Sequence, residues 1–278
     1  MSDTIRRALI CLVVVGGCSS ESSAPATTTT SSGDATEGIT AEVERDRQFG
    51  TEGKLGLGFV NHTAAAQQLH DFALDSPLFE VVPPEAREVL LRPDGIVITM
   101  PMSFGPAICD PGAPAGPSVV VATIDGAEQR LPVDDAPLRA QHARDCAVRG
   151  VFEAADIRFG DDWESISEVT MAGQVELRRR GEDDVTVEGI TGSVLFSVTA
   201  DGEISDALQV DADREVARVD VVVSAAGCTP HALIEAKRGF RFPMWVRTGD
   251  GEAVQIELEP TGAERAPFEA LLERCAGG

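Results

Sequence analysis

The chain contains an internal repeat, and duplication of one domain is the feature that most narrows its possible folds. The segments 72–81 (FALDSPLFEV) and 189–198 (GITGSVLFSV) share four residues at matching positions, namely Ser76 and Ser193, Leu78 and Leu195, Phe79 and Phe196, and Val81 and Val198. A single match of this kind arises easily by chance. The prediction of two copies therefore depends on further landmarks in the same order.

Three such landmarks follow the first in both halves of the chain. The first is an apolar run before a Cys-x-Pro tripeptide, at 109–111 and 228–230. The second is a Thr-x-Asp-Gly tetrapeptide, at 123–126 and 248–251. The third is an Ala-Pro pair that starts a helix-like pattern before a cysteine, at 136–138 and 266–268. The ordered set predicts that one domain occurs twice.

Within each copy the sequence favours strands. Short segments rich in β-branched and aromatic residues, such as 119–123 and 240–246, are bounded by Gly, Pro and Asp, which is typical of an all-β sandwich. We therefore predict a mainly β protein with a first sandwich over 51–162 and a second over 163–278. Runs of acidic residues such as Glu182 to Asp184 are interpreted as turn residues and surface charge.

Short helices are expected between the strands. Thr229 as N-cap, Pro230 at the first helical position and Gly239 as stop predict a helix over 230–238. A helix starting at about Pro267 carries one apolar stripe with the spacing i, i+3, i+4, i+7. The first copy has a fainter version, formed by Leu138, His142 and Cys146.

The N-terminus has the pattern of an export signal. Arg6 and Arg7 precede an apolar run over 8–15, which is far too short to span a bilayer. Val15-Gly16-Gly17-Cys18 resembles the bacterial lipobox, and this resemblance implies that residues 1–17 are removed and that Cys18 is diacylated and holds the protein on the outer face of a membrane. The alternative is general secretion with cleavage nearby and an incidental Cys18.

Residues 18–50 are expected to form a disordered tether, because Ser, Thr, Ala, Gly and Glu bury too little apolar area to offset the entropy of ordering.

The formal net charge of the chain is −23, which disfavours binding to nucleic acid and directly to an anionic membrane surface. Such a charge either favours a cationic partner or a metal ion, or serves only to keep an exported protein soluble and monomeric.

Four cysteines remain once Cys11 leaves with the signal and Cys18 takes the lipid. An even number in an exported protein predicts disulfides, and four cysteines allow three pairings. The repeat selects Cys109 with Cys146 and Cys228 with Cys275. A zinc site built from four thiolates is the alternative, although no C-x-x-C pair is present.

The common signatures of hydrolases, zinc proteases and nucleotide sites are absent from the sequence, so we expect no enzyme and no cofactor. His231 and Glu235 share one face of the helix predicted over 230–238, which would suit a metal ion or a base with its orienter in a hydrolytic enzyme. The simpler interpretation is a short solvent-exposed helix. His142 is expected to be a packed or half-exposed core residue.

A metal site and a sugar site are two further hypotheses. Met100 and Met102 alternate in a predicted strand and, with His62 or His70, could bind copper(I) in an exported carrier; core packing of both methionines is the alternative. Carbohydrate binding needs exposed aromatic rings. Trp163 is the candidate for such a surface position, whereas Trp245 lies in an apolar run and is expected to be buried.

Taken together, these features resemble the exported lipoproteins of high-GC Gram-positive bacteria that carry tandem immunoglobulin-like sandwiches and have no assigned activity. The resemblance rests on the lipobox, the duplicated landmarks and the segment 228–240 (CTPHALIEAKRGF). It implies an immunoglobulin-like fold and a lipid-anchored, extracytoplasmic location. We expect a binding or assembly module for another envelope protein, with a copper carrier as the alternative and a hydrolytic enzyme as a weaker one.

Overall fold

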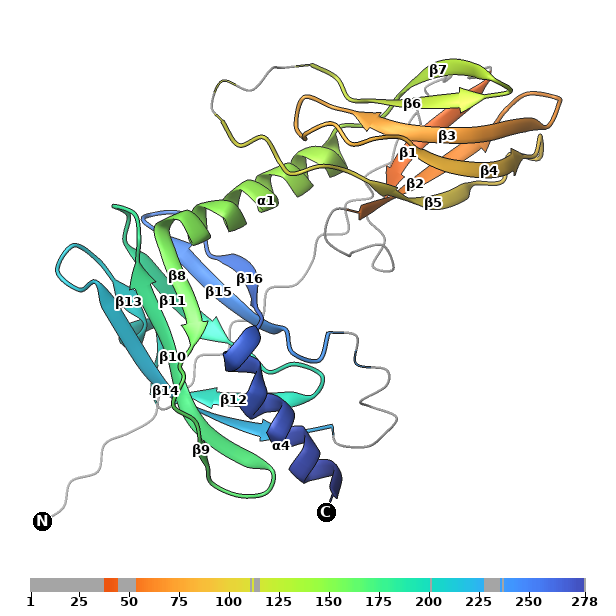
Figure 1. Cartoon of the computed structure of the whole chain (residues 1–278). Helices are drawn as coiled ribbons and strands as arrows, with labels where there is room; N and C mark the ends of the chain where they lie inside the picture. Colours follow the sequence, from red (N-terminus) through yellow and green to blue (C-terminus); the bar gives the residue numbers. More distant parts are fainter. Residues whose placement is uncertain are drawn as a thin grey trace, which may run out of the picture. The chain divides into compact units, whose positions relative to one another are not determined.

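The computed structural model describes residues 38–44, 54–110, 112, 116–200, 202–227, 236 and 238–277. In this part of the chain the protein is mainly β, and every strand pairing is antiparallel (Figure 1). The strands form four sheets, two in each half of the chain. The prediction of a mainly β protein with antiparallel sheets is confirmed, whereas the immunoglobulin-like strand arrangement stays a prediction.

The first half contains a three-stranded sheet and a four-stranded sheet that share one apolar core. The smaller sheet has the order β1 (Ile39–Glu44), β2 (Lys54–Asn61), β5 (Ile98–Ser103). The larger has the order β4 (Glu85–Leu91), β3 (Gln67–Asp75), β6 (Val119–Ile124), β7 (Ala127–Pro132). Alternate side chains point inward, so Phe59 of β2 meets Phe72 of β3 with ring centroids 5.4 Å apart.

The second half repeats this plan around a larger core. One sheet has the order β12 (Phe196–Ala200), β14 (Val216–Ala225), β10 (Thr170–Arg179), β8 (Ala155–Phe159), with the short β9 (Glu164–Ser165) also paired to β10. The other has the order β13 (Gln209–Val210), β11 (Val185–Ile190), β15 (Phe242–Thr248), β16 (Val254–Leu258). A short helix, α2 (Ile204–Ala207), precedes β13.

The two halves have equivalent strand orders when strands are matched along the chain. The order β1-β2-β5 corresponds to β8-β10-β14, and β4-β3-β6-β7 corresponds to β13-β11-β15-β16. Each half then ends in a helix, α1 (Ala136–Ala154) or α4 (Ala266–Gly277). Shared topology of this kind is what duplication of one domain predicts. The second half adds β12 beside β14, where the first half has only the isolated bridge between Phe79 and Ala107.

The Ser-x-Leu-Phe landmark forms the same local structure in both halves. The backbone N–H of Leu78 donates to Ser76 Oγ and that of Leu195 donates to Ser193 Oγ, each at 3.2 Å. The turn directs Phe79 and Phe196 inward, where they are 3% and 1% exposed. The repeated residues therefore encode a repeated side-chain to backbone turn followed by a core anchor.

Two predicted boundaries are wrong. The predicted tether over 18–50 includes β1, whose Ile39 and Val43 are buried in the first core, because a short alternating strand can pair with β2 despite its polar neighbours. The predicted boundary between 162 and 163 lies too late. The strand β8 pairs with β10 and places Ile157 and Phe159 in the second core.

Both terminal helices occur near the predicted positions. The helix α4 follows a 3-10 turn, η2 (Gly262–Arg265), and buries the predicted stripe of Phe268, Leu271 and Leu272. The helix α1 contributes Leu138 to the first core and Val151 to the second.

The helix predicted over 230–238 lies outside the described residues except for Ala236 and Arg238, neither of which is helical. No helix in the described part of the chain has the length and hydropathy needed to cross a bilayer.

A disulfide joins Cys109 to Cys146 with an S–S distance of 2.12 Å. It ties the segment that follows β5 to the middle of α1, in agreement with the predicted pair. Cys275 in α4 is also disulfide-bonded. Its predicted partner Cys228 and the predicted lipidation site Cys18 lie outside the described residues.

Candidate functional site

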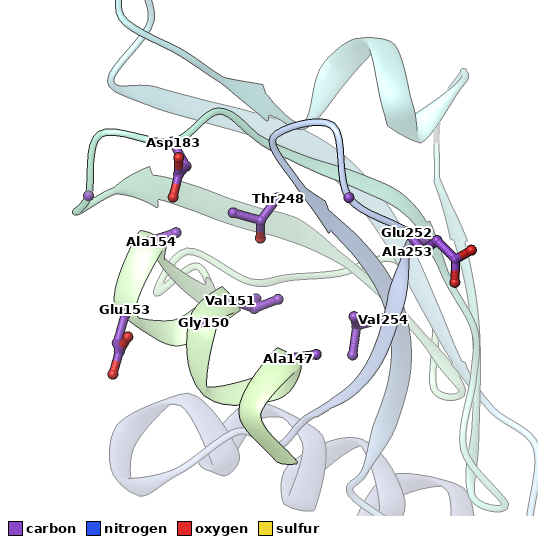
Figure 2. Close-up of a pocket in the computed structure, with 12 residues that line it drawn as sticks. Ala147, Gly150, Val151, Glu153, Ala154, Asp183, Thr248, Glu252, Ala253 and Val254 are labelled. Atoms are coloured by element: carbon purple, nitrogen blue, oxygen red, sulfur yellow. The ribbon is translucent and has the colours of Figure 1, made fainter. Parts of the chain in front are cut away.

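A cavity of about 570 Å³ lies between the last turns of α1, the loop from β10 to β11 and the turn from β15 to β16 (Figure 2). This volume falls within the range of ligand pockets in proteins, roughly 300 to 1,000 Å³. All three walls belong to the second sandwich or to the end of α1 that packs on it. We describe this cavity as the cleft.

The α1 wall consists of small and apolar side chains. Ala147, Gly150, Val151 and Ala154 have the spacing i, i+3, i+4, i+7 and therefore share one face of the helix, which lines the cleft. Val151 also reaches into the second core. A Cβ atom added to Gly150 would meet no other atom within 4 Å. The small side chains leave the volume that larger residues would fill.

Backbone hydrogen bonds attach the other two walls to this helix and to each other. The Ala154 carbonyl at the end of α1 accepts from the N–H groups of Arg180 and Gly181 at 2.8 and 3.0 Å. The N–H of Gly249 donates to the Asp184 carbonyl at 2.8 Å, which joins the hairpin turn to the loop. The cleft therefore has walls in defined positions, as expected for a largely pre-formed site.

The charged residues that line the cleft are all acidic. Glu153, Asp183 and Glu252 stand at the rim of the cleft, one on each wall, and all three are exposed. In Figure 2 the side chains of Glu153 and Glu252 point away from the space between Val151 and Val254. The last turn of α1 has no basic residue, so the partial negative charge of the helix C-terminus adds to the carboxylates.

Two arginines come directly before the loop that forms one wall of the cleft. Arg180 pairs with Asp156 at 3.2 Å, and Arg179 Nε donates to the Asp183 backbone carbonyl at 3.4 Å. Arg179 also donates to the Glu182 carbonyl, so its positive charge lies beside the loop wall of the cleft.

Thr248 brings an unsatisfied hydrogen-bonding group to the cleft. Its side-chain oxygen is buried and, among the described residues, has no hydrogen-bond partner. Figure 2 shows this oxygen directed toward the space between the hairpin and α1. Because this oxygen is closed off from solvent, a group that enters the cleft does not reach it in this structure, and its missing partner is a feature of the local packing.

The acidic lining does not form a metal-binding set. Within the described ranges, no three His, Cys, Asp or Glu side chains converge closely enough to hold an ion. The residues of the copper hypothesis are also dispersed. Met100 and Met102 are buried in the first core, whereas His62 Nε2 lies 2.9 Å from Thr40 Oγ1. His70 Nδ1 lies 3.1 Å from Glu88 Oε1 at the surface.

The two tryptophans reverse their expected environments. Trp163 was expected at the surface but is half-buried, packs on Phe268 at a centroid distance of 5.0 Å and donates its indole N–H to the Gly160 carbonyl at 2.8 Å. Gly173 on β10 leaves the room for its ring. Trp245 was expected to be buried but is 36% exposed, because its position on β15 points away from the core.

Two further predictions concern histidines, His231 of the enzyme hypothesis and His142 as a core residue. His231 and Glu235 lie outside the described residues. His142 is half-buried as expected, with Nε2 2.9 Å from the Ile108 carbonyl oxygen and its ring edge-on to Phe79. These contacts account for His142 as a packing residue beside the Cys109–Cys146 disulfide.

The cleft was missed by the sequence reasoning. Its acidic loop residues were interpreted as surface charge, and the small residues of α1 carry no chemical signature. The sequence feature that could have indicated the cleft is the spacing of Ala147, Gly150 and Ala154, which places three small residues on one helical face. Acidic turns follow at 182–184 and 250–252. Which turns meet that face depends on strand order, which local patterns do not specify.

Comparisons with known proteins add little to this picture. No family model matches the chain, and no curated protein matches it. Among solved structures, a protein of unknown function from Porphyromonas gingivalis W83 is similar, with 11% identity over 80% of this chain and 97% of that chain and a TM-score of 0.21. The BSP domain of a biofilm-associated protein is similar at 8% identity, over 83% of this chain and 60% of that chain, with a TM-score of 0.17. Scores this low carry no argument about function.

Proposed function

We propose that this chain is a lipid-anchored binding or assembly module of the cell envelope, and that the cleft receives a protruding group of its partner. The observation that carries the proposal is the cavity of about 570 Å³, whose α1 wall presents the small side chains of Ala147, Gly150 and Ala154. Pockets that accept one anchoring side chain are common at the centre of protein interfaces.

The location is supported by two independent features. The N-terminal sequence ending in Cys18 resembles a lipobox, and the Cys109–Cys146 disulfide is of the kind that persists in oxidising compartments. A lipid on Cys18 would hold the sandwiches at the extracytoplasmic face of the membrane. In that position the module would meet other envelope proteins.

The test is an affinity capture from detergent-solubilised envelope with the full chain as bait. The matched baits are Gly150→Trp, which fills the cleft at a position where a Cβ meets nothing, and Ala143→Trp, which adds the same ring at an exposed position of α1. We expect one partner to be retained by the wild type and Ala143→Trp and lost with Gly150→Trp. Retention by all three baits would show that the cleft is not the binding site.

A further inference from the structure

We infer that the outer face of the second sandwich binds an acidic segment of a protein partner through the arginines grouped around Glu176. The outer face consists of the outward-pointing side chains of β8, β10, β14 and β12, which lie side by side in one sheet (Figure 1). It shares no residue with the lining of the cleft, so the inference goes beyond the proposed function.

Strand register places the arginines in one group. Glu176 on β10 pairs with Arg158 on β8 and with Arg218 on β14, so the three residues form a row across neighbouring strands. Arg178 lies two residues further along β10 and therefore on the same face. Three guanidinium groups thus surround one carboxylate, which leaves two positive charges in excess within this group.

The contacts with Glu176 use one edge of each guanidinium group in the row. Arg158 donates through Nε and Nη2 to Oε1 at 3.3 and 3.0 Å, and Arg218 donates through Nε and Nη2 to Oε2. Within the described ranges, neither arginine donates to any other group. A guanidinium group carries five N–H donors in one plane, so the edge formed by Nη1 and Nη2 remains for a second carboxylate.

The arginine side chains of this group are accessible from outside. Those of Arg158, Arg178 and Arg218 are 41%, 50% and 53% exposed, whereas that of Glu176 is 7% exposed. The carboxylate therefore lies beneath the guanidinium groups and holds them in place, and an approaching anion meets the arginines first. Side chains already held in position lose less entropy on binding.

Three further carboxylates belong to the surroundings of this group. Asp156 pairs with Arg180 at 3.2 Å, Asp220 on β14 accepts a hydrogen bond from a glutamine amide at 2.7 Å, and Asp161 lies close enough to attract Arg158. With these residues included, four arginines face four carboxylates, in a chain with 23 basic and 46 acidic residues. The outer face therefore lacks the negative excess of the whole chain, and its positive charge is concentrated around Glu176.

The net charge of −23 decides between kinds of anionic partner. A polyanion such as a nucleic acid or a phosphate polymer would be repelled by the chain as a whole. A protein partner can present a few carboxylates in one place without negative charge elsewhere. The charge balance therefore favours an acidic segment of a protein.

An uncharged row on the same face also favours a protein partner. Ala172 on β10, Val222 on β14 and Thr199 on β12 lie in register, and Val222 is 36% exposed. Protein interfaces combine apolar contacts with arginine, which is enriched there. Val222 follows Arg218 by four residues, or about 13 Å along the strand. We therefore expect an acidic residue of the partner at the arginines and an apolar residue over Val222.

Binding can be measured on the full chain in detergent by titration calorimetry. The probe is a short blocked peptide with two adjacent glutamates and, four residues later, a leucine. The comparison ligands are the same peptide with glutamine in place of both glutamates, and sodium tripolyphosphate as an anion without a peptide. We expect the glutamate peptide to bind at least about tenfold more tightly than the glutamine peptide, and more tightly than tripolyphosphate.

Substitutions that conserve charge test the arginine geometry. Arg158→Lys combined with Arg218→Lys keeps the positive charges beside Glu176 but removes the second hydrogen-bonding edge. The control combines Arg92→Lys with Arg144→Lys, two exposed arginines of the first half of the chain. The first pair should weaken peptide binding about tenfold, and the control pair should stay within about twofold of the wild type.

Urea unfolding checks that both double variants keep the fold. If the first pair unfolds the sheet, Arg178→Gln takes its place, because it leaves both arginines of the row on Glu176, and it should weaken peptide binding about threefold. Equal affinity of the glutamate and glutamine peptides would overturn the inference, as would equal losses in the two double variants. Tighter binding of tripolyphosphate would refute the protein partner in favour of a phosphate-rich ligand. The cleft is tested separately by Gly150→Trp.

Discussion

Arg218 Nε donates to Glu176 Oε2 at 2.8 Å on the outer face of the second sandwich, and Arg158 and Arg178 donate to the other oxygen of the same carboxylate. Glu176 is only 5% exposed, although it points away from the core between the inward-facing Val175 and Leu177. Three guanidinium groups cover it. A carboxylate held in this way belongs to the stability of the sheet.

The first prediction concerns this carboxylate and pH. Burial acts to raise the pKa of Glu176, but hydrogen bonds from Arg218, Arg158 and Arg178 outweigh burial and hold the pKa below its ordinary value of 4.5. A lowered folded-state pKa stabilises the fold above the unfolded-state value, and the contribution is lost as the pH falls through the folded-state pKa. Glu176→Gln should reduce the free energy of unfolding by about 1 to 2 kcal/mol near neutral pH.

Urea unfolding at neutral and acidic pH measures this effect. The difference between wild type and Glu176→Gln should shrink below the folded-state pKa of Glu176, because the wild-type carboxylate is then protonated too. Glu188→Gln is the control, since Glu188 pairs with Arg247 at 2.7 Å but is 38% exposed at its side chain. Its effect should stay below about 1 kcal/mol. Equal effects of both substitutions would argue against a special role of burial.

The second prediction concerns the Cys109–Cys146 disulfide. It closes a loop with a sequence separation of 37, for which loss of chain entropy in the unfolded state predicts stabilisation of up to about 4 kcal/mol. The double variant Cys109→Ser, Cys146→Ser should lower the stability of the first sandwich by several kcal/mol, measured by circular dichroism during urea unfolding. Reduction is a poorer test because it also opens the disulfide of Cys275. An unchanged unfolding midpoint would contradict the expectation.

The third prediction concerns the contact of Trp163 with Gly173. A Cβ atom on Gly173 would lie 2.5 Å from the indole ring, so Gly173→Ala must displace Trp163. We expect destabilisation by about 1 to 3 kcal/mol and a change in near-ultraviolet circular dichroism. In a double-mutant cycle, Gly173→Ala should be much less harmful in a Trp163→Ala background. An additive result would show that the ring does not limit the size of residue 173.

The fourth prediction tests the repeat at the level of energetics. Ser76→Ala and Ser193→Ala each remove the acceptor for the N–H of the leucine two positions later. Each should lower the stability of its own sandwich by about 1 kcal/mol. Ser167→Ala, whose hydroxyl accepts an exposed bond from the N–H of Val169 at 3.3 Å, is the control and should have little effect. Opposite results at the two serines would argue against equivalent turns.

The fifth prediction concerns the unpaired hydroxyl of Thr248. Thr248→Val keeps the shape of the side chain and removes a buried oxygen that has no partner among the described residues. The variant should gain up to about 1 kcal/mol in stability. Thermal unfolding of the wild type and the variant measures the gain. Loss of stability in the free protein would show that the hydroxyl has a partner after all.

The strands and helices were readable because their signals are local. The alternation of Val119 to Thr123, the Ala-Pro starts of the two terminal helices and the Ser-x-Leu-Phe turns each depend on residues close in sequence. The pairing of Cys109 with Cys146 followed from the repeat. Boundaries were less predictable, because Ile39 and Val43 read as strand residues only once β2 lies beside them.

The sequence by itself determined the mainly β composition, the duplication and the first disulfide, since periodicity, turn residues and matching landmarks are properties of neighbouring residues or of the chain compared with itself. The tertiary structure decided which distant loops meet. It brought Glu153, Asp183 and Glu252 to the rim of one cleft, packed Trp163 half-buried against the second core and left Trp245 exposed. The physical reason is that these environments depend on strand order and on which face of a strand packs inward, and many long-range contacts together fix both.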